Sequence, residues 1–142
     1  MIAKSTKILL VDDFSLARIM LSEALNKLGM EDIVEAKDGQ EAISVLENLF
    51  LVKKPIEFIF LDWTMPVMNG FEVLEKCRAD ERFANIPIVM VTAEIEQESV
   101  LKALAAGATD YIKKPISQDA LVKKIEKGSW SPGWCRRAAG FR

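Results

Sequence analysis

In the segment Phe58-Ile59-Phe60-Leu61-Asp62, four consecutive apolar residues end at a carboxylate. The segment Ile8-Leu9-Leu10-Val11 ends in the same way, at the adjacent pair Asp12-Asp13. Unbroken apolar runs of this length are typical of strands that are buried on both faces of a parallel sheet. Like charges a few Å apart repel each other by several kcal/mol at an effective dielectric of ~20. Three acids brought to one edge by two such strands therefore indicate that a cation binds there.

The composition is that of a single soluble globular domain. The chain has 142 residues, of which 50% are hydrophobic and 28% are charged. A domain of about this length buries roughly two thirds of its unfolded surface. No run approaches the ~20 apolar residues of a membrane span, and residues 1–7 lack the apolar centre of a signal peptide. We therefore expect a cytoplasmic protein.

Histidine is absent from the chain, and the cysteines show no disulfide pattern. Cys77 and Cys135 have neither CxxC spacing nor an even framework, so we expect free thiols and no zinc site. Without histidine the chain lacks the commonest general base and any Ser-His or Cys-His nucleophile. Metal binding is therefore left to oxygen ligands.

Short apolar runs alternate with segments of helical periodicity, which predicts βα units and a parallel sheet. The predicted strands span Lys7 to Val11, Asp32 to Ala36, Glu57 to Leu61, Pro87 to Val91 and Asp110 to Ile112. The first predicted helix begins near Ser15, the second spans Gly39 to Leu51, and the third begins near Gly70. The fourth spans Glu96 to Ala106 before Gly107, and the fifth spans Ser117 to Lys127. Such helices can cover both faces of the sheet.

The first helix has recognisable start and stop signals. Ser15 is the predicted N-cap, and Gly29 is the predicted stop. The helical spacing predicts that one face of this helix packs on the sheet through Leu16, Ile19, Met20, Ala24 and Leu28.

Right-handed crossovers between these strands give an open, doubly wound sheet. Ligands of such sheets bind beyond the carboxyl ends of the strands, where the strand order reverses. If the order is 2-1-3-4-5, the first and third strands flank that point, and Asp12, Asp13 and Asp62 share one crevice. Three carboxylates with positions left for water suit Mg²⁺, and Mn²⁺ can substitute.

Two further side chains are expected at the same edge. Thr92 follows the fourth predicted strand, and Lys113-Lys114-Pro115 follows the fifth. A cation, a hydroxyl and an ammonium around a carboxylate can stabilise the three oxygens of a phosphoryl group, and a carboxylate is a competent nucleophile for an aspartyl phosphate. The predicted chemistry is phosphoryl transfer onto Asp62.

Five motifs follow one another along residues 5 to 127: Val11-Asp12-Asp13-Phe14-Ser15, Asp62-Trp63-Thr64-Met65-Pro66, Asn69-Gly70, Val91-Thr92-Ala93-Glu94 and Lys114-Pro115. Together they resemble the receiver domain of bacterial response regulators, and most closely its single-domain chemotaxis members. The resemblance implies a flavodoxin-like α/β fold, with a doubly wound five-stranded parallel sheet in the order 2-1-3-4-5 and five helices.

The resemblance implies roles for the acids and their surroundings. Asp62 corresponds to the phosphoacceptor, Asp13 to a direct Mg²⁺ ligand, Asp12 to a ligand through water, and Thr64 to a ligand through its backbone carbonyl. The relatives have asparagine where Thr64 stands, at a position that tunes dephosphorylation together with that of Glu94. The phosphoryl lifetime is therefore left open.

The resemblance also implies a switch. Lys114 is expected to pair with the acyl phosphate and to precede a cis peptide bond. Thr92 is expected to hydrogen-bond the phosphoryl group, and Tyr111 to change rotamer with it. Taken from the residues alone, Tyr111 could simply cap the core, and Thr92 could simply end a strand.

The composition changes abruptly at Gly128. The segment 128–142 holds three arginines and no acid, which leaves 16 basic and 21 acidic side chains in residues 1–127, a net charge of −5. We expect residues 1–127 to form the receiver domain and residues 128–142 to be a tail that is disordered, added in cloning or read out of frame. The alternative is a basic, aromatic peptide that docks on a partner or an anionic surface.

The predicted function is that of a single-domain response regulator in a two-component phosphorelay. A histidine kinase is the expected phosphodonor and a protein such as a flagellar motor switch the expected target, with a phosphatase as a possible further partner. The protein is expected to catalyse only its own phosphorylation and dephosphorylation, and to bind neither nucleic acid nor a membrane. The alternative is a phosphorylation-independent, receiver-like interaction module. A phosphatase of the haloacid-dehalogenase type would need a second aspartate in place of Thr64, and Asp12-Asp13 would repel the phosphate of a flavin.

Overall fold

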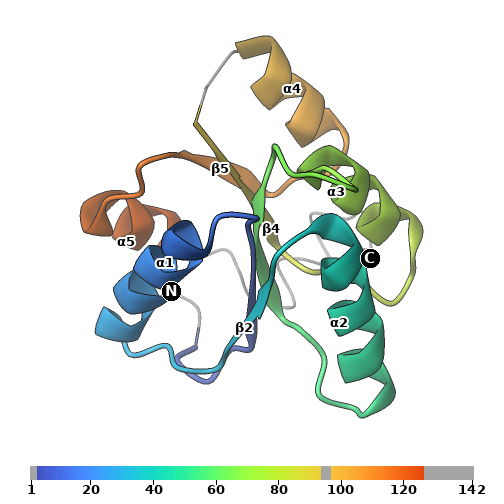
Figure 1. The fold of residues 1–142 in the computed structure, drawn as a ribbon, viewed down its shortest axis with the longest axis horizontal. Helices are drawn as coiled ribbons and strands as arrows, with labels where there is room; N and C mark the ends of the chain where they lie inside the picture. Colours follow the sequence, from blue (N-terminus) through green and yellow to red (C-terminus); the bar gives the residue numbers. More distant parts are fainter. Residues whose placement is uncertain (1–2, 94–96, 127–142) are drawn as a thin grey trace.

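The computed structural model describes residues 3–93 and 97–126. Five parallel strands form one sheet in the order β2-β1-β3-β4-β5, with helices on both faces (Figure 1). The elements are β1 (Ile8–Val11), α1 (Ser15–Lys27), β2 (Ile33–Ala36), α2 (Gly39–Leu51), β3 (Phe58–Asp62), α3 (Gly70–Ala79), β4 (Ile88–Thr92), α4 (Gln97–Ala105), β5 (Asp110–Lys113) and α5 (Gln118–Glu126). The predicted fold class, strand order and element order are confirmed.

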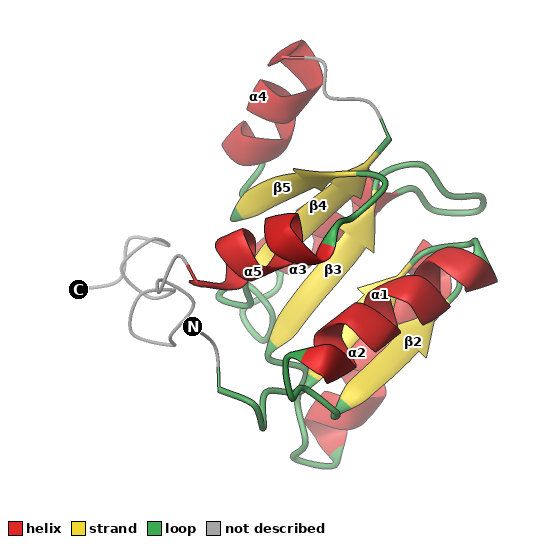
Figure 2. Cartoon of the chain, turned by 90° about the vertical axis from the view of Figure 1, so that its left-hand side faces the viewer, coloured by secondary structure: helices red, strands yellow, loops and turns green. Residues whose placement is uncertain are grey.

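The strands of the sheet divide the core into two clusters. On one face, α1 and α5 pack on the sheet through residues such as Leu21, Leu25 and Leu121. On the other face, α2, α3 and α4 contribute residues such as Leu46 and Leu74, an arrangement visible in Figure 2. β1 and β3 are buried along their whole length, as expected for strands covered on both faces.

The strand boundaries differ from the predicted ones by one residue. β3 extends to Asp62 because this residue still pairs with Val91 of β4. β4 likewise extends to Thr92, which pairs with Lys113 of β5. The carboxylate and the hydroxyl therefore belong to the last rungs of the sheet and not to the loops that follow.

The predicted packing of α1 is correct for Ala24 and Leu28, which pack on the sheet, and wrong for the other three residues. Leu16, Ile19 and Met20 are 52%, 49% and 56% exposed, whereas Leu21 and Leu25 are buried. The segment carries two apolar stripes, and the one through Leu21, Ala24, Leu25 and Leu28, spaced i, i+3, i+4 and i+7, faces the sheet.

The predicted N-cap of α1 is also wrong. Phe14 occupies that position and makes no side-chain cap, while Ser15 is the first helical residue. The carboxylate of Asp12 takes over the capping role by accepting a hydrogen bond from the backbone N–H of Phe14 at 2.9 Å. The predicted stops are correct, because Gly29 and Gly107 adopt positive φ angles of 90° and 109° just after α1 and α4.

Gly70 brings the loop after β3 close to the sheet. Its backbone N–H donates to the carbonyl oxygen of Trp63 at 2.8 Å, and a Cβ atom at this position would lie 2.0 Å from the carbonyl oxygen of Asp62. Only glycine fits so close an approach. The next turn is fixed by a capping box between Asn69 and Glu72.

Among the helices that the structure describes, none is both long and apolar enough to cross a membrane. Cys77 is buried in the core as a free thiol. Cys135, Glu94 and the tail from residue 128 lie outside the described residues.

Candidate functional site

Three carboxylates meet at the carboxyl edge of the sheet. Val11 of β1 pairs with Leu61 of β3, so the acids that follow these two residues lie side by side. Ligand atoms of Asp12, Asp13 and Asp62 lie within 4.8 Å of one another. Asp12 and Asp62 are buried, whereas Asp13 is exposed. The cluster thus has two acids embedded in the sheet edge and one that faces solvent.

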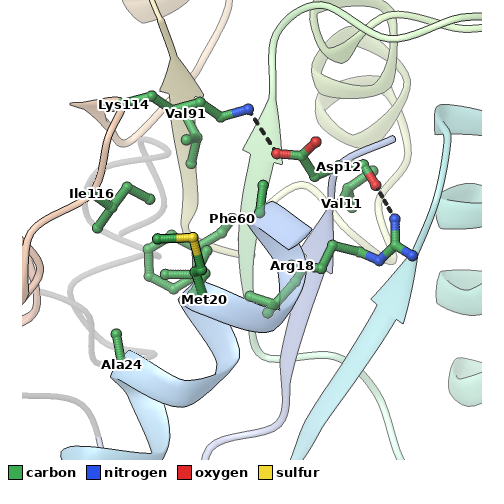
Figure 3. A pocket seen from close by; sticks show the side chains of 12 residues that line it. Val11, Asp12, Arg18, Met20, Ala24, Phe60, Val91, Lys114 and Ile116 are labelled. Carbon is green, nitrogen blue, oxygen red and sulfur yellow. Dashed lines mark hydrogen bonds and ion pairs between the residues drawn. The ribbon is translucent and has the colours of Figure 1, made fainter. Parts of the chain in front are cut away.

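Lys114 reaches this cluster from the loop after β5. Its Nζ atom lies 2.7 Å from Oδ2 of Asp12 and 3.2 Å from Oδ1 of Asp62, and Figure 3 shows the side chain pointing at Asp12. The backbone N–H of Lys114 donates to the carbonyl oxygen of Thr92 at 2.7 Å, and the peptide bond to Pro115 is cis. The neighbouring Lys113 is exposed.

The electrostatics of the site are dominated by Asp62. The pKa of Asp62 is raised to about 6, chiefly by burial and also by repulsion from Asp12 and Asp13, while Lys114 acts to lower it. Burial lowers the pKa of Lys114, but its hydrogen bond to Asp12 and the charges of Asp62 and Asp12 outweigh burial, so that pKa is raised overall. Lys114 therefore stays charged, and one ammonium faces three acids.

The donor set fits a hard divalent cation. All three acids offer oxygen ligands, which Mg²⁺ and Mn²⁺ prefer over nitrogen and sulfur. A single ammonium leaves the cluster with excess negative charge. Because Asp13 is exposed, a cation bound here would keep water ligands, as Mg²⁺ usually does.

The remaining predicted residues differ in how far they are buried. Thr92 is half-buried at the end of β4, next to Lys113 in the sheet. Thr64 is exposed two residues beyond Asp62. Tyr111 is half-buried in β5, where its ring packs against the core on the side of α2, α3 and α4, with Nζ of Lys124 at 4.7 Å from the ring centroid. Glu94 falls outside the described part of the chain.

Arg18 is a site residue that the sequence patterns do not reveal. It lies on α1, and its guanidinium donates to the carbonyl oxygen of Asp12. A basic residue six positions after a carboxylate is a weak signal in sequence, because its contact depends on how α1 is rotated against the sheet. That rotation is the feature that periodicity predicts wrongly here.

A small apolar cavity lies beside the site, between α1 and the sheet. It has a volume of about 90 Å³, and its polar lining consists of Asp12, Arg18 and Lys114. Figure 3 shows Met20 and Phe60 on its apolar side.

Comparison with known proteins gives consistent matches over nearly the whole chain. The family model of the response regulator receiver domain matches residues 8–126. The chemotaxis protein CheY-3 of Vibrio cholerae is 39% identical over 124 residues, which cover 87% of this chain and 92% of the relative. The chemotaxis protein CheY of Pseudomonas aeruginosa is 40% identical over 121 residues, which cover 85% of this chain and 94% of the relative.

Solved structures show the same fold. The chemotaxis protein CheY4 of Vibrio cholerae, crystallised at low pH, matches with a TM-score of 0.77 and 33% identity, over 87% of this chain and 98% of that chain. A structure of the CheX–CheY complex of Borrelia burgdorferi with BeF₃ and Mg²⁺ matches with a TM-score of 0.78 and 26% identity, over 87% of this chain and 88% of that chain.

Proposed function

The chain belongs to the response regulator receiver domain family, and from that membership we propose that it is a phosphorylation switch whose acceptor is Asp62. It is a signalling protein of the kind found among chemotaxis regulators, and not a turnover enzyme. Its only chemistry is its own phosphorylation and dephosphorylation. We assign this function to residues 1–127, a division supported by the match of the family model to residues 8–126.

The surroundings of Asp62 are the main support for this function. Asp62 is a buried carboxylate at a strand end, 3.2 Å from an ammonium and clustered with two further acids. A carboxylate in this position can act as a nucleophile, while the groups around it stabilise the charge on a transferring phosphoryl group. The raised pKa of Asp62, about 6, still leaves the side chain mostly ionised at neutral pH.

The acids of the cluster also define the metal site. Asp13 and Asp62 would bind Mg²⁺ directly, Asp12 through a water molecule, and Thr64 through its backbone carbonyl. Mn²⁺ can take the same place. When bound, the cation supplies positive charge to the crowded acids and to the phosphoryl oxygens. Support comes from the Borrelia burgdorferi relative, whose structure includes Mg²⁺ and BeF₃.

Phosphoryl transfer begins with an oxygen of Asp62 in line with the phosphorus of a phosphohistidine on a histidine kinase. The new bond joins this oxygen to phosphorus, and the bond that breaks joins phosphorus to the imidazole nitrogen, which keeps the electron pair. Lys114, already in contact with Asp62, then pairs with a phosphoryl oxygen. Thr92 donates its hydroxyl hydrogen to another.

The added phosphoryl group carries roughly 1.5 to 2 negative charges. Movement of Thr92 toward it leaves room for Tyr111 to turn inward, which reshapes the surface formed by α4, β5 and α5. A coupling of about 1 to 3 kcal/mol, or about 5- to 150-fold in partner affinity, is typical of such switches. The output is a protein contact, with a flagellar motor switch as the proposed target.

Dephosphorylation is the step in which we expect this chain to differ from the chemotaxis regulators that it resembles, which have asparagine at the position of Thr64. Thr64 and Glu94 tune it, since a shorter, branched side chain at 64 would position the attacking water differently. A phosphatase partner is part of the proposal, and the Borrelia burgdorferi relative, whose structure contains a second protein, CheX, supports partner binding by this fold.

The test is intact-mass analysis after incubation with acetyl phosphate and Mg²⁺. Wild-type protein should gain one labile phosphoryl group, and neither Asp62→Asn nor the metal-free control should gain it. If folded wild-type protein binds Mg²⁺ but gains no phosphoryl group from this donor, the acceptor function is excluded for small donors, and the phosphorylation-independent interaction module becomes the better description.

A further inference from the structure

Arg18 joins three segments around the acidic cluster. From α1, its Nε atom donates to Oε1 of Glu35 in β2 at 2.9 Å, while Nη1 donates to the carbonyl oxygen of Asp12. Figure 3 shows Arg18 on one side of Asp12 and Lys114 on the other. The side chain of Arg18 is only 17% exposed, although it is charged. Because the guanidinium is planar and is hydrogen-bonded at two points, it holds these segments rigidly.

Every polar group of Asp12 has a partner. Its N–H donates to the carbonyl oxygen of Ala36 at 3.1 Å, Oδ1 accepts from the N–H of Phe14, and Oδ2 accepts from Lys114. The carbonyl oxygen, the remaining polar group, is the one that Arg18 binds. The carbonyl of the peptide group between residues 12 and 13 is therefore held by Arg18, and the preceding peptide group, between residues 11 and 12, is held by the sheet.

Asp13 is held quite differently. Its side chain is exposed, and among residues 3–93 and 97–126 it has neither a hydrogen bond nor an ion pair. Its direction is consequently set by the backbone on either side of it, and the preceding peptide group is the one that Arg18 braces.

The choice of acceptor on Asp12 matters for cation binding. An arginine that paired with the carboxylates would compete with a divalent cation for the same oxygens. Arg18 instead binds a backbone carbonyl, and Glu35 holds the guanidinium at its other end. Its positive charge lies near the cluster, yet every carboxylate oxygen of Asp13 stays available to a metal.

Building on the proposed function, we infer that Arg18 is a positioning residue for the cation site: it fixes the Asp12–Asp13 peptide group so that the Asp13 carboxylate is preorganised to bind Mg²⁺. Residues that orient metal ligands in this way typically contribute about 10- to 100-fold to metal affinity. The rival explanation is that Arg18 only ties α1 to β2 and so contributes to stability alone.

The chain offers a matched control for that rival explanation. Lys7 and Asp32 form an ion pair at 3.0 Å at the opposite end of β1 and β2. The exposed fractions of the two side chains are 19% and 46%, close to the 17% and 44% of Arg18 and Glu35. Lys7→Ala therefore removes an ion pair of similar exposure that also reaches the β2 segment, without touching the acidic edge.

The experiment measures Mg²⁺ affinity by titration calorimetry for wild type, Arg18→Ala and Lys7→Ala, with the stability of each in EDTA determined by urea unfolding. Arg18→Ala should bind Mg²⁺ about 10- to 100-fold more weakly, and Lys7→Ala should bind it as wild type does.

Phosphorylation of Arg18→Ala by acetyl phosphate should need more Mg²⁺ but approach the wild-type rate at saturation. Methylguanidinium, which can enter beside the small cavity, should restore part of the affinity, and methylammonium should not.

Equal Mg²⁺ affinity in wild type and folded Arg18→Ala would overturn the inference and leave the proposed function intact. So would an equal loss in Lys7→Ala, because the effect would then be general to the strand pair. If Arg18→Ala does not fold, Arg18→Lys, which keeps the charge but loses the fork, takes its place with the same expected loss. Absence of saturable Mg²⁺ binding in wild type would instead contradict the proposed function itself.

Discussion

The burial that suits Asp62 to its proposed role has a cost in stability. Its burial beside Asp12 and Asp13 favours the protonated form of the folded protein. A group that binds its proton more tightly when folded stabilises the protein at low pH, and that stabilisation is lost as the pH rises through the folded-state pKa. For Asp62, whose pKa rises from 3.8 to about 6, the loss falls between about pH 4 and pH 6.

We therefore predict that Asp62→Asn stabilises the metal-free protein at neutral pH. The shift in the pKa of Asp62 sets an upper limit of about 3 kcal/mol on the gain. Urea unfolding in EDTA at about pH 4.5 and about pH 7.5 measures it, with the larger gain expected at the higher pH.

Asp80→Asn is a control, because the pKa of Asp80 is shifted in the opposite direction from that of Asp62. Its hydrogen bonds to Arg82 lower its pKa, so it stabilises the folded state only while ionised, and Asp80→Asn should give no gain at neutral pH. If Asp62→Asn were no more stable than wild type above pH 7, the ionised carboxylate would not be destabilising, and its environment would differ from the one described.

Gly70 affects the placement of a whole segment, because it lets the loop between β3 and α3 fold back on β3, the strand that carries Asp62. In Gly70→Ala, the added Cβ would lie 2.0 Å from the carbonyl oxygen of Asp62, so this loop must move. We predict a loss of stability of at least about 1 to 3 kcal/mol and strongly reduced phosphorylation by acetyl phosphate.

Gly29→Ala is the matched change at the end of α1, away from the site. Gly29 has a φ of 90°, so alanine should cost about 1 kcal/mol there through backbone strain and leave phosphorylation unchanged. Normal phosphorylation in Gly70→Ala would show that the close approach of the loop does not matter for the acceptor.

A second prediction about a single element follows from the orientation of α1 on the sheet. Leu25 is completely buried, whereas Ile19 is 49% exposed. Leu25→Ala should therefore cost about 2 to 5 kcal/mol in urea unfolding, and Ile19→Ala should cost at most about 1 kcal/mol. The reverse order would mean that α1 packs on the sheet by the face expected from its sequence.

The strands were predictable for a physical reason that α1 does not share. A strand buried on both faces allows only apolar residues, so runs such as the one before Asp62 have one interpretation. Doubly wound topology then brought Asp12, Asp13, Asp62 and Lys114 to one edge. A surface helix with two apolar stripes has two interpretations, and the contact of Arg18 depended on which stripe was buried.

At the scale of the whole molecule, the proposed cation binding would be coupled to folding. A ligand that binds only the folded protein stabilises it by about 2.7 kcal/mol at a free concentration 100 times its dissociation constant. We predict that Mg²⁺ raises the thermal unfolding temperature, and that NaCl at matched ionic strength does not. EDTA should reverse the effect. Asp13→Asn should remove most of it, and an unchanged shift in that variant would place the cation elsewhere.

The contact between Lys114 and Asp12 joins positions 102 apart in the chain. The acidic cluster comes from the ends of β1 and β3, and the ammonium of Lys114 comes from the segment after β5, so nearly the whole sheet must be assembled before these groups meet. Under the proposed function, a nascent, clipped or misfolded copy would lack this arrangement and could not carry a phosphoryl group. The phosphorylated population would then consist of molecules whose sheet is fully assembled.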